Sequence, residues 1–315
     1  QYEYSLIDRF FILTHTYVFY LVKLIIPINL SCIYAYPEIN DGLLPLTYYL
    51  SAIVPFALIF FIIRYRNKEQ KIISGVLFFS LAVAPVLPLF WSRIFVAADR
   101  YAYLSFIGLF LVAGILADRF ISSEKLKSRS IQYLSVLILL AYGLFLMFIT
   151  NRQCKYWIDS DVLLSRAVML SKTGPEKALS HFYLANVQQG IAENRYSQGQ
   201  LNANEEMIKN SFVYYGLAVS NYDTVLKYNP EYMMAYANRG MIYGTLFTHD
   251  NKYLELARSD FEQAISLNPD YADNYYNKGW LLFVSGEADE ACKNWRKADS
   301  LVSVFAYQSI EQNCK

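Results

Sequence analysis

An acidic and a basic residue, Asp99 and Arg100, stand side by side before a long apolar stretch, and Tyr101 follows them. An unpaired guanidinium facing a cavity suits a phosphate or diphosphate, because its planar donors match phosphate oxygens. The simpler alternative is an ion pair between Asp99 and Arg100 at a membrane surface. The motif therefore predicts either an anion site or a local pair, and the sequence leaves both open.

Two asparagines, Asn238 and Asn277, recur at the same place in two similar helical segments. A row of side-chain amides can hydrogen-bond an extended peptide backbone without reading its sequence. A solvated polar face is the alternative explanation of the same pattern. We expect Asn238 and Asn277 to line a peptide-binding groove if the segments stack.

The four cysteines, Cys32, Cys154, Cys292 and Cys314, form no CxxC pair and have no histidine at metal-ligand spacing. We therefore predict no metal site from them. A disulfide between Cys292 and Cys314 in an oxidising compartment and two free thiols are both compatible with the spacing.

The elements that must position these residues fall into two unlike halves. Residues 1–150 carry 12 Lys/Arg and 8 Asp/Glu and are mostly apolar, whereas residues 151–315 carry 16 and 19. Neither half is basic enough to indicate a nucleic-acid partner. Because about 20 apolar residues cross a bilayer as a helix, the first half predicts five membrane spans. They are residues 10–33, 43–63, 72–91, 101–117 and 131–149.

The short loops between these spans indicate the orientation. Loops 64–71 and 118–130 carry eight basic residues, whereas loops 34–42 and 92–100 carry only Arg93 and Arg100. Basic loops stay in the cytoplasm. We therefore expect the N-terminus in the cytoplasm, and the residues after Thr150 outside it together with Asp99 and Arg100.

The second half predicts an α-solenoid of tetratricopeptide-type (TPR) helix pairs. Small residues recur where two helices of a 34-residue unit cross, as at Gly240, Ala257, Gly279 and Ala291. Such units bury their apolar faces only by stacking. The expected units are residues 177–230, 232–269 and 271–304, with a lead-in helix at 155–171 and a capping helix at 302–315.

These halves resemble the C-terminal part of the transmembrane and tetratricopeptide-repeat-containing protein O-mannosyltransferases and their bacterial relatives. The resemblance rests on three stretches, with Ser105-Phe106 departing from it where relatives tend to have a proline. They are Ala98–Leu104 followed by Ile107-Gly108, Pro27–Ser31 ending at Tyr36-Pro37, and Arg152 to Trp157.

The resemblance implies an all-α, type C glycosyltransferase fold and a polyprenyl-phosphate-linked donor, with mannose as the sugar and a protein hydroxyl as acceptor. Arg100 would then hold the donor phosphate, Asp99 would orient Arg100, and Tyr101 would belong to the same site. In that family an acidic pair in the first outer loop acts as base and as metal or donor contact. Glu38 and Asp41, the carboxylates of the first outer loop of this chain, do not match that motif. We therefore expect the chain, which begins at Gln1, to be a catalytically incomplete part of a longer enzyme.

We weigh two functions, the first of which is implied by the resemblance. The first is the donor-binding and acceptor-presenting portion of a membrane glycosyltransferase, with no cofactor within this chain and the need for a divalent metal left open. The alternative is a non-catalytic, membrane-anchored TPR scaffold that recruits envelope or secretory-pathway proteins. We expect a bacterial inner-membrane protein with periplasmic repeats, or luminal repeats in the endoplasmic reticulum if the protein is eukaryotic.

Overall fold

The computed structural model describes residues 4–39, 41–88, 95–122 and 129–314. It divides into two compact units, Gln1–Leu170 and Ser171–Lys315. The boundary lies 20 residues after the predicted one at Thr150, because a short helix that follows the last apolar helix packs with the first unit. The described residues form helices, and the only β pairing among them is one isolated bridge.

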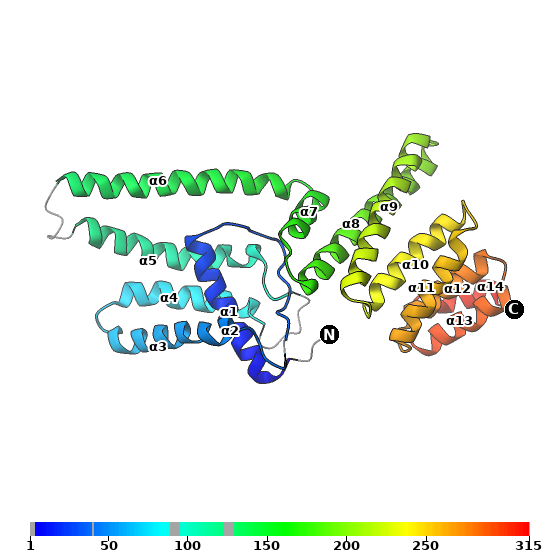
Figure 1. The fold of residues 1–315 in the computed structure, drawn as a ribbon, viewed down its shortest axis with the longest axis horizontal. Coiled ribbons are helices and arrows are strands. Elements are labelled where there is room, and N and C mark those ends of the chain that lie inside the picture. The colour runs from blue at the N-terminus through cyan, green and yellow to red at the C-terminus, as the bar shows by residue number, and fades with distance from the viewer. Residues whose placement is uncertain (1–3, 40, 89–94, 123–128, 315) are drawn as a thin grey trace. The chain divides into compact units, whose positions relative to one another are not determined.

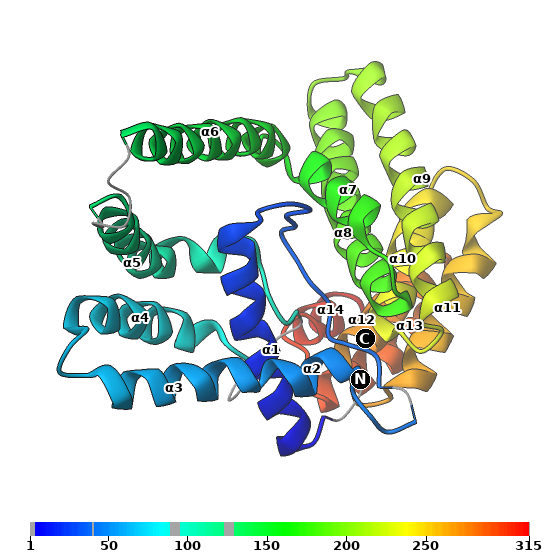
Figure 2. The same ribbon diagram turned by 60° about the vertical axis from the view of Figure 1, so that its left-hand side comes forward.

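The first unit consists of α-helices joined by short loops and 3₁₀ turns. Helices α3, α4, α5 and α6 run roughly parallel to one another, whereas α1 runs across them (Figures 1 and 2). The α-helices are α1 (Leu6–Ile25), α2 (Leu46–Ser51), α3 (Ile53–Tyr65), α4 (Gln70–Val83), α5 (Tyr103–Ile121), α6 (Arg129–Cys154) and α7 (Ser160–Leu170). The 3₁₀ turns are η1 (Ala84–Val86), η2 (Asp99–Ala102) and η4 (Lys155–Trp157).

Three stretches of the described chain are long and apolar enough to cross a membrane. They are Leu46–Tyr65, Asp99–Ile121 and Ile131–Trp157, and Gln70–Val86 is a shorter apolar helix. The predicted arrangement of five spans is therefore not confirmed. The end of the predicted third span at residues 89–91, and Arg93, Lys125 and Lys127 of the predicted loops, lie outside the described residues.

The first predicted span, residues 10–33, differs most from the structure. A capping box of Ser5 and Asp8 starts α1, and the helix ends at Ile25. Pro27 explains this end, because a proline disfavours the helical conformation of the residue before it. Every 18-residue window of α1 contains Asp8, Arg9 and Lys23, so α1 lacks the uncharged length of a span. The predicted side of residues after Thr150 does not depend on α1.

Glycines allow α4 and α5 to approach closely. A Cβ on Gly75 would lie 2.5 Å from the carbonyl oxygen of Gly108 and 2.6 Å from Val112 Cγ2. Small residues permit this kind of contact between membrane helices, where packing replaces the hydrophobic effect as the driving force.

We expect Gly108→Leu to separate α4 from α5 and to lower the free energy of unfolding by about 1–3 kcal/mol, because the added side chain overpacks the crossing. The measurement is the thermal unfolding midpoint of the purified chain in detergent. Gly114→Leu is the matched control, because a Cβ added there meets no atom within 4 Å. Equal midpoints for the two variants would contradict the role of this crossing.

The second unit contains three antiparallel helix pairs in the three predicted repeat units, followed by a capping helix (Figure 1). The pairs are α8 (Gly174–Leu201) with α9 (Glu205–Tyr228), α10 (Met233–Phe247) with α11 (Tyr253–Leu267), and α12 (Ala272–Val284) with α13 (Ala288–Ser300). The capping helix is α14 (Ala306–Asn313). The first pair is longer than the other two, because α8 has 28 residues and α9 has 24.

The small residues lie where the helices of a pair cross. A Cβ on Gly279 would lie 2.6 Å from the ring of Trp295, and one on Gly240 would lie 3.0 Å from the ring of Phe261. Both rings are buried. The last unit is also closed covalently, because Cys292 of α13 forms a disulfide with Cys314 after α14, with 5.7 Å between their Cα atoms.

Candidate functional site

The structure brings together the two polar loops of the first unit. Tyr34 N donates to Ala97 O at 3.1 Å, and Val96 N donates to Tyr34 O at 2.9 Å, which forms the isolated bridge. Tyr20 of α1 supports this bridge, because its hydroxyl donates to Ala98 O at 3.3 Å. The loop after α1 and the loop before α5 are therefore held as one layer, which the sequence did not indicate.

Asp99 comes two residues after Ala97 of this bridge and is 9% exposed. The hydroxyl of Tyr34 donates to its carboxylate, at 3.1 Å to Oδ1 and 3.4 Å to Oδ2. Burial, and after it the charge of Asp99, raises the pKa of the Tyr34 phenol well above its usual value. Tyr34 therefore stays protonated at neutral pH and remains a donor to the carboxylate.

Arg100 forms its hydrogen bond with the loop after α1 and none with Asp99. Its Nη1 donates to Cys32 O at 3.3 Å, and its guanidinium carbon lies 5.0 Å from the ring centroid of Tyr101. Within the described parts of the chain Arg100 forms no ion pair, with Asp99 or with any other residue. The structure thus does not support the local ion pair, and the predicted orienting contact of Asp99 on Arg100 is not seen.

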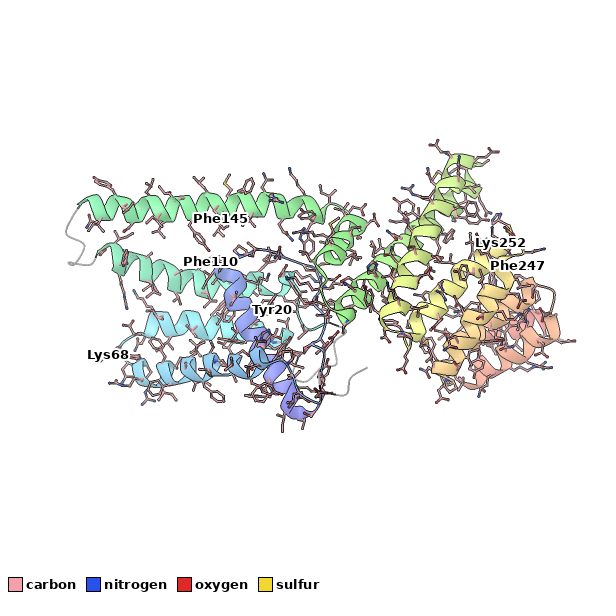
Figure 3. The ribbon with its side chains drawn as sticks, in the orientation of Figure 1. Tyr20, Lys68, Phe110, Phe145, Phe247 and Lys252 are labelled. Atoms are coloured by element: carbon pink, nitrogen blue, oxygen red, sulfur yellow. A yellow bond between two sulfur atoms is a disulfide. The ribbon has the colours of Figure 1, made fainter. Side chains whose placement is uncertain are left out.

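A cavity of about 630 Å³ lies next to these residues. Its polar end contains the side chains of Lys23, Asp99 and Arg100, and its wall is mostly apolar (Tyr20 and Phe110 are labelled in Figure 3). The remaining lining residues are Tyr20, Leu24, Pro27, Leu30, Ala102, Tyr103, Phe106, Phe110, Leu146, Ile149, Thr150, Gln153, Cys154 and Trp157.

Sequence reasoning missed two features of this cavity. Lys23 was not assigned to a site from the sequence, yet it lines the cavity and attracts Asp99 electrostatically. The apolar wall from α6, with Leu146 and Ile149, carried no polar signal that could have marked it. The signal that could have added Lys23 to the site is that it is a lysine within an apolar stretch.

The two groove asparagines lie in different surroundings. Asn238 is half-buried, and its Nδ2 donates to Asn186 Oδ1 at 3.0 Å. The buried hydroxyl of Tyr222 also donates to Asn186, at 2.6 Å, and burial raises its pKa. Asn277 is half-buried and has no hydrogen-bond partner in the described chain. The structure therefore leaves the whole amide of Asn277 available to a ligand, whereas one donor of Asn238 is already bonded to Asn186.

An ion pair between helices holds the middle of the array. Arg239 of α10 donates to both oxygens of Asp260 on α11, at 2.8 Å and 2.7 Å, and also bonds Asp223 of α9. The side chain of Asp260 is 6% exposed and that of Arg239 is 17% exposed. Burial raises the pKa of Asp260 against the opposing effect of Arg239. This network joins two repeat units and has a structural role.

Comparison with known proteins gives one family match, and it lies in the second unit. The tetratricopeptide repeat family matches residues 261–293. No curated protein matches the sequence. Solved structures match part of the chain, among them the following two. The first TPR domain of Spaghetti (RPAP3), bound to an HSP90 peptide, is 22% identical over 41% of this chain and 88% of its own, with a TM-score of 0.30.

The structure of MamA is 21% identical over 45% of this chain and 66% of its own, with a TM-score of 0.32. At these identities and scores neither likeness carries an argument about function. The family match agrees with the helix pairs of the structure and with the small residues at their crossings. The chain therefore carries a tetratricopeptide repeat within its C-terminal helical array.

Proposed function

We propose that this chain is the C-terminal portion of a membrane glycosyltransferase, which transfers a sugar from a polyprenyl-phosphate donor to protein hydroxyls outside the cytoplasm. The observation that carries the proposal is the cavity of the first unit, in which cationic side chains meet an apolar wall. A polyprenyl phosphate has the matching chemistry, because its charged phosphate is joined directly to an apolar chain.

Arg100 is the group that we assign to the phosphate. It forms one hydrogen bond, to Cys32 O, so the other donors of its planar guanidinium are available in the described structure. Arginine binds phosphate oxygens with paired donors, and such charge-assisted bonds are stronger than neutral ones. Asp99 and Tyr101 flank it, with the carboxylate held by Tyr34. We assign no catalytic base among the residues of this chain.

The repeat array has the second role in this proposal, which is to bind the acceptor protein. TPR arrays offer extended surfaces suited to protein segments. The half-buried, unbonded amide of Asn277 supports such binding. The disulfide between Cys292 and Cys314 supports an oxidising compartment, because such bonds persist outside the cytosol. We therefore propose repeats on the periplasmic or luminal side, with mannose as the transferred sugar.

The proposal is tested with membranes that contain the full-length protein. We expect them to transfer label from radiolabelled polyprenyl-phosphate mannose to an acceptor protein, in a linkage that β-elimination releases from serine or threonine. Membranes without the protein are the control. No transfer above this control, with every acceptor fraction tried, would contradict the glycosyltransferase proposal.

A membrane-anchored scaffold is the second candidate, and the TPR match favours it independently of the cavity. In that case the repeats recruit a protein partner, and the cavity residues have no part in the activity. A protein that still crosslinks to its partner after loss of the cavity cations, and that transfers no sugar, would be this scaffold.

A further inference from the structure

Lys23 lies in the last turn of α1, at the polar end of the cavity. Its Nζ donates to the carbonyl oxygens of Ile28 at 2.6 Å and Asn29 at 3.3 Å. These contacts hold the ammonium group at one place, although the lysine stem has four flexible bonds. An ammonium group has three N–H donors, so one donor stays free of these two carbonyls.

The charges at this end of the cavity do not cancel. Lys23 and Arg100 are two cations, and Asp99 is the one carboxylate among the lining residues. Asp99 is already hydrogen-bonded by Tyr34, and it attracts Lys23. One positive charge therefore remains in partly apolar surroundings, where an unbalanced charge is costly and an anion is favoured.

The geometry points to Lys23 as a second cation that, together with Arg100, binds the phosphate of a polyprenyl lipid in this cavity, an inference that rests on the proposed function. Lys23 comes from α1 and Arg100 from the turn before α5, so the phosphate is held between two elements. Tyr34 holds Asp99 in place beside them.

The cavity also indicates that the phosphate belongs to a lipid. About 630 Å³ is in the range of sites for drug-sized ligands and far exceeds the needs of a free phosphate ion. The wall next to the cations is formed by Phe106 and Phe110 of α5 and by Leu146 and Ile149 of α6. Such a wall suits the first isoprene units of the chain and offers no donor to an inorganic ion.

The test measures binding of decaprenyl phosphate to the purified chain in detergent by native mass spectrometry. We expect Lys23→Gln to weaken this binding roughly tenfold, because a charge-assisted bond is lost. Lys23→Arg should keep wild-type affinity. Lys68→Gln is the matched control, because it removes an equal charge at the turn between α3 and α4, outside the cavity lining (Figure 3).

Two further ligands show whether binding depends on the phosphate group or on the apolar chain. Decaprenol, which has no phosphate, should bind Lys23→Gln and wild type equally, and inorganic phosphate should not compete with the lipid at millimolar concentration. Equal loss of decaprenol and decaprenyl phosphate would overturn the inference, because the variant would then have damaged the cavity. Competition by inorganic phosphate alone would overturn the lipid assignment.

The same measurements distinguish this inference from the proposed function. Weaker binding to Arg100→Gln but not to Lys23→Gln would overturn the role of Lys23 and leave the donor site intact. A wild-type chain that does not bind decaprenyl phosphate would overturn the inference and remove the main support of the proposed function. Normal lipid binding without sugar transfer by the full-length protein would contradict the enzyme alone.

Discussion

Under the proposed function, Arg100→Ala should lower sugar transfer by the full-length protein by about a hundredfold to a thousandfold, while the protein still inserts into the membrane. The estimate is the usual cost of removing one donor that stabilises developing charge in an active site. Arg100 has one protein hydrogen bond, to Cys32 O, and no ion pair in the described structure, so its removal changes the fold little. The measurement is the initial rate of label transfer from polyprenyl-phosphate mannose.

Arg119→Ala is the matched control for this experiment. Arg119 forms an exposed ion pair with Glu69, 2.8 Å long, at the end of α5 that does not contact the cavity. Exposed pairs of this kind contribute little, so the rate should stay near that of wild type. Arg100→Lys should restore part of the rate, because lysine keeps the charge but lacks the paired donors. A wild-type rate in Arg100→Ala would rule out its role at the phosphate.

Asp260→Ala should lower the stability of the repeat array by about 3 kcal/mol. The change leaves the mostly buried Arg239 with Asp223 as its remaining partner, and an uncompensated buried charge is costly. Asp223 is 54% exposed, so it compensates only in part. Amide hydrogen exchange of α10 and α11 in the full chain should therefore become about a hundredfold faster.

Two other variants show whether the effect comes from the buried charge. Arg258→Ala breaks the exposed bond to Glu287 and should change the stability by less than about 1 kcal/mol. The double variant Arg239→Met with Asp260→Leu should recover most of the loss, because an apolar pair has no charge to desolvate. Amide exchange of α10 and α11 in Asp260→Ala that is as slow as in wild type would show that the network does not hold these helices together.

The helical array was predictable because its pattern is local. Gly240 and Gly279 recur at the positions where two helices of a unit cross, and the structure places the rings of Phe261 and Trp295 directly over them. A close crossing requires a residue without a side chain at that point, whatever surrounds it. The same reasoning did not extend to the groove, because the sequence does not show that Asn186 of α8 would bind the amide of Asn238.

The apolar half was predictable in composition but less so in arrangement. Hydropathy places the apolar stretches, whereas the start of α1 depends on the capping box of Ser5 and Asp8 and its end at Ile25 depends on Pro27. That α1 runs across α3 to α6 depends on packing between helices, including Tyr17 of α1, whose hydroxyl lies 2.8 Å from Ser80 Oγ of α4. Contacts between residues so far apart in sequence leave no period in the chain.

The sequence by itself determined that a guanidinium follows a carboxylate at the start of an apolar helix. It also determined that the first half is mostly apolar and that the second half consists of repeated helix pairs. Only the tertiary structure decided that Asp99 and Arg100 do not pair. It joined Asp99 to Tyr34 and Arg100 to Cys32 O, and it placed Lys23 in the same cavity. The physical reason is that the side chains of adjacent residues in a 3₁₀ turn point in different directions. Asp99 and Arg100 therefore bond two different residues of the loop after α1 instead of each other.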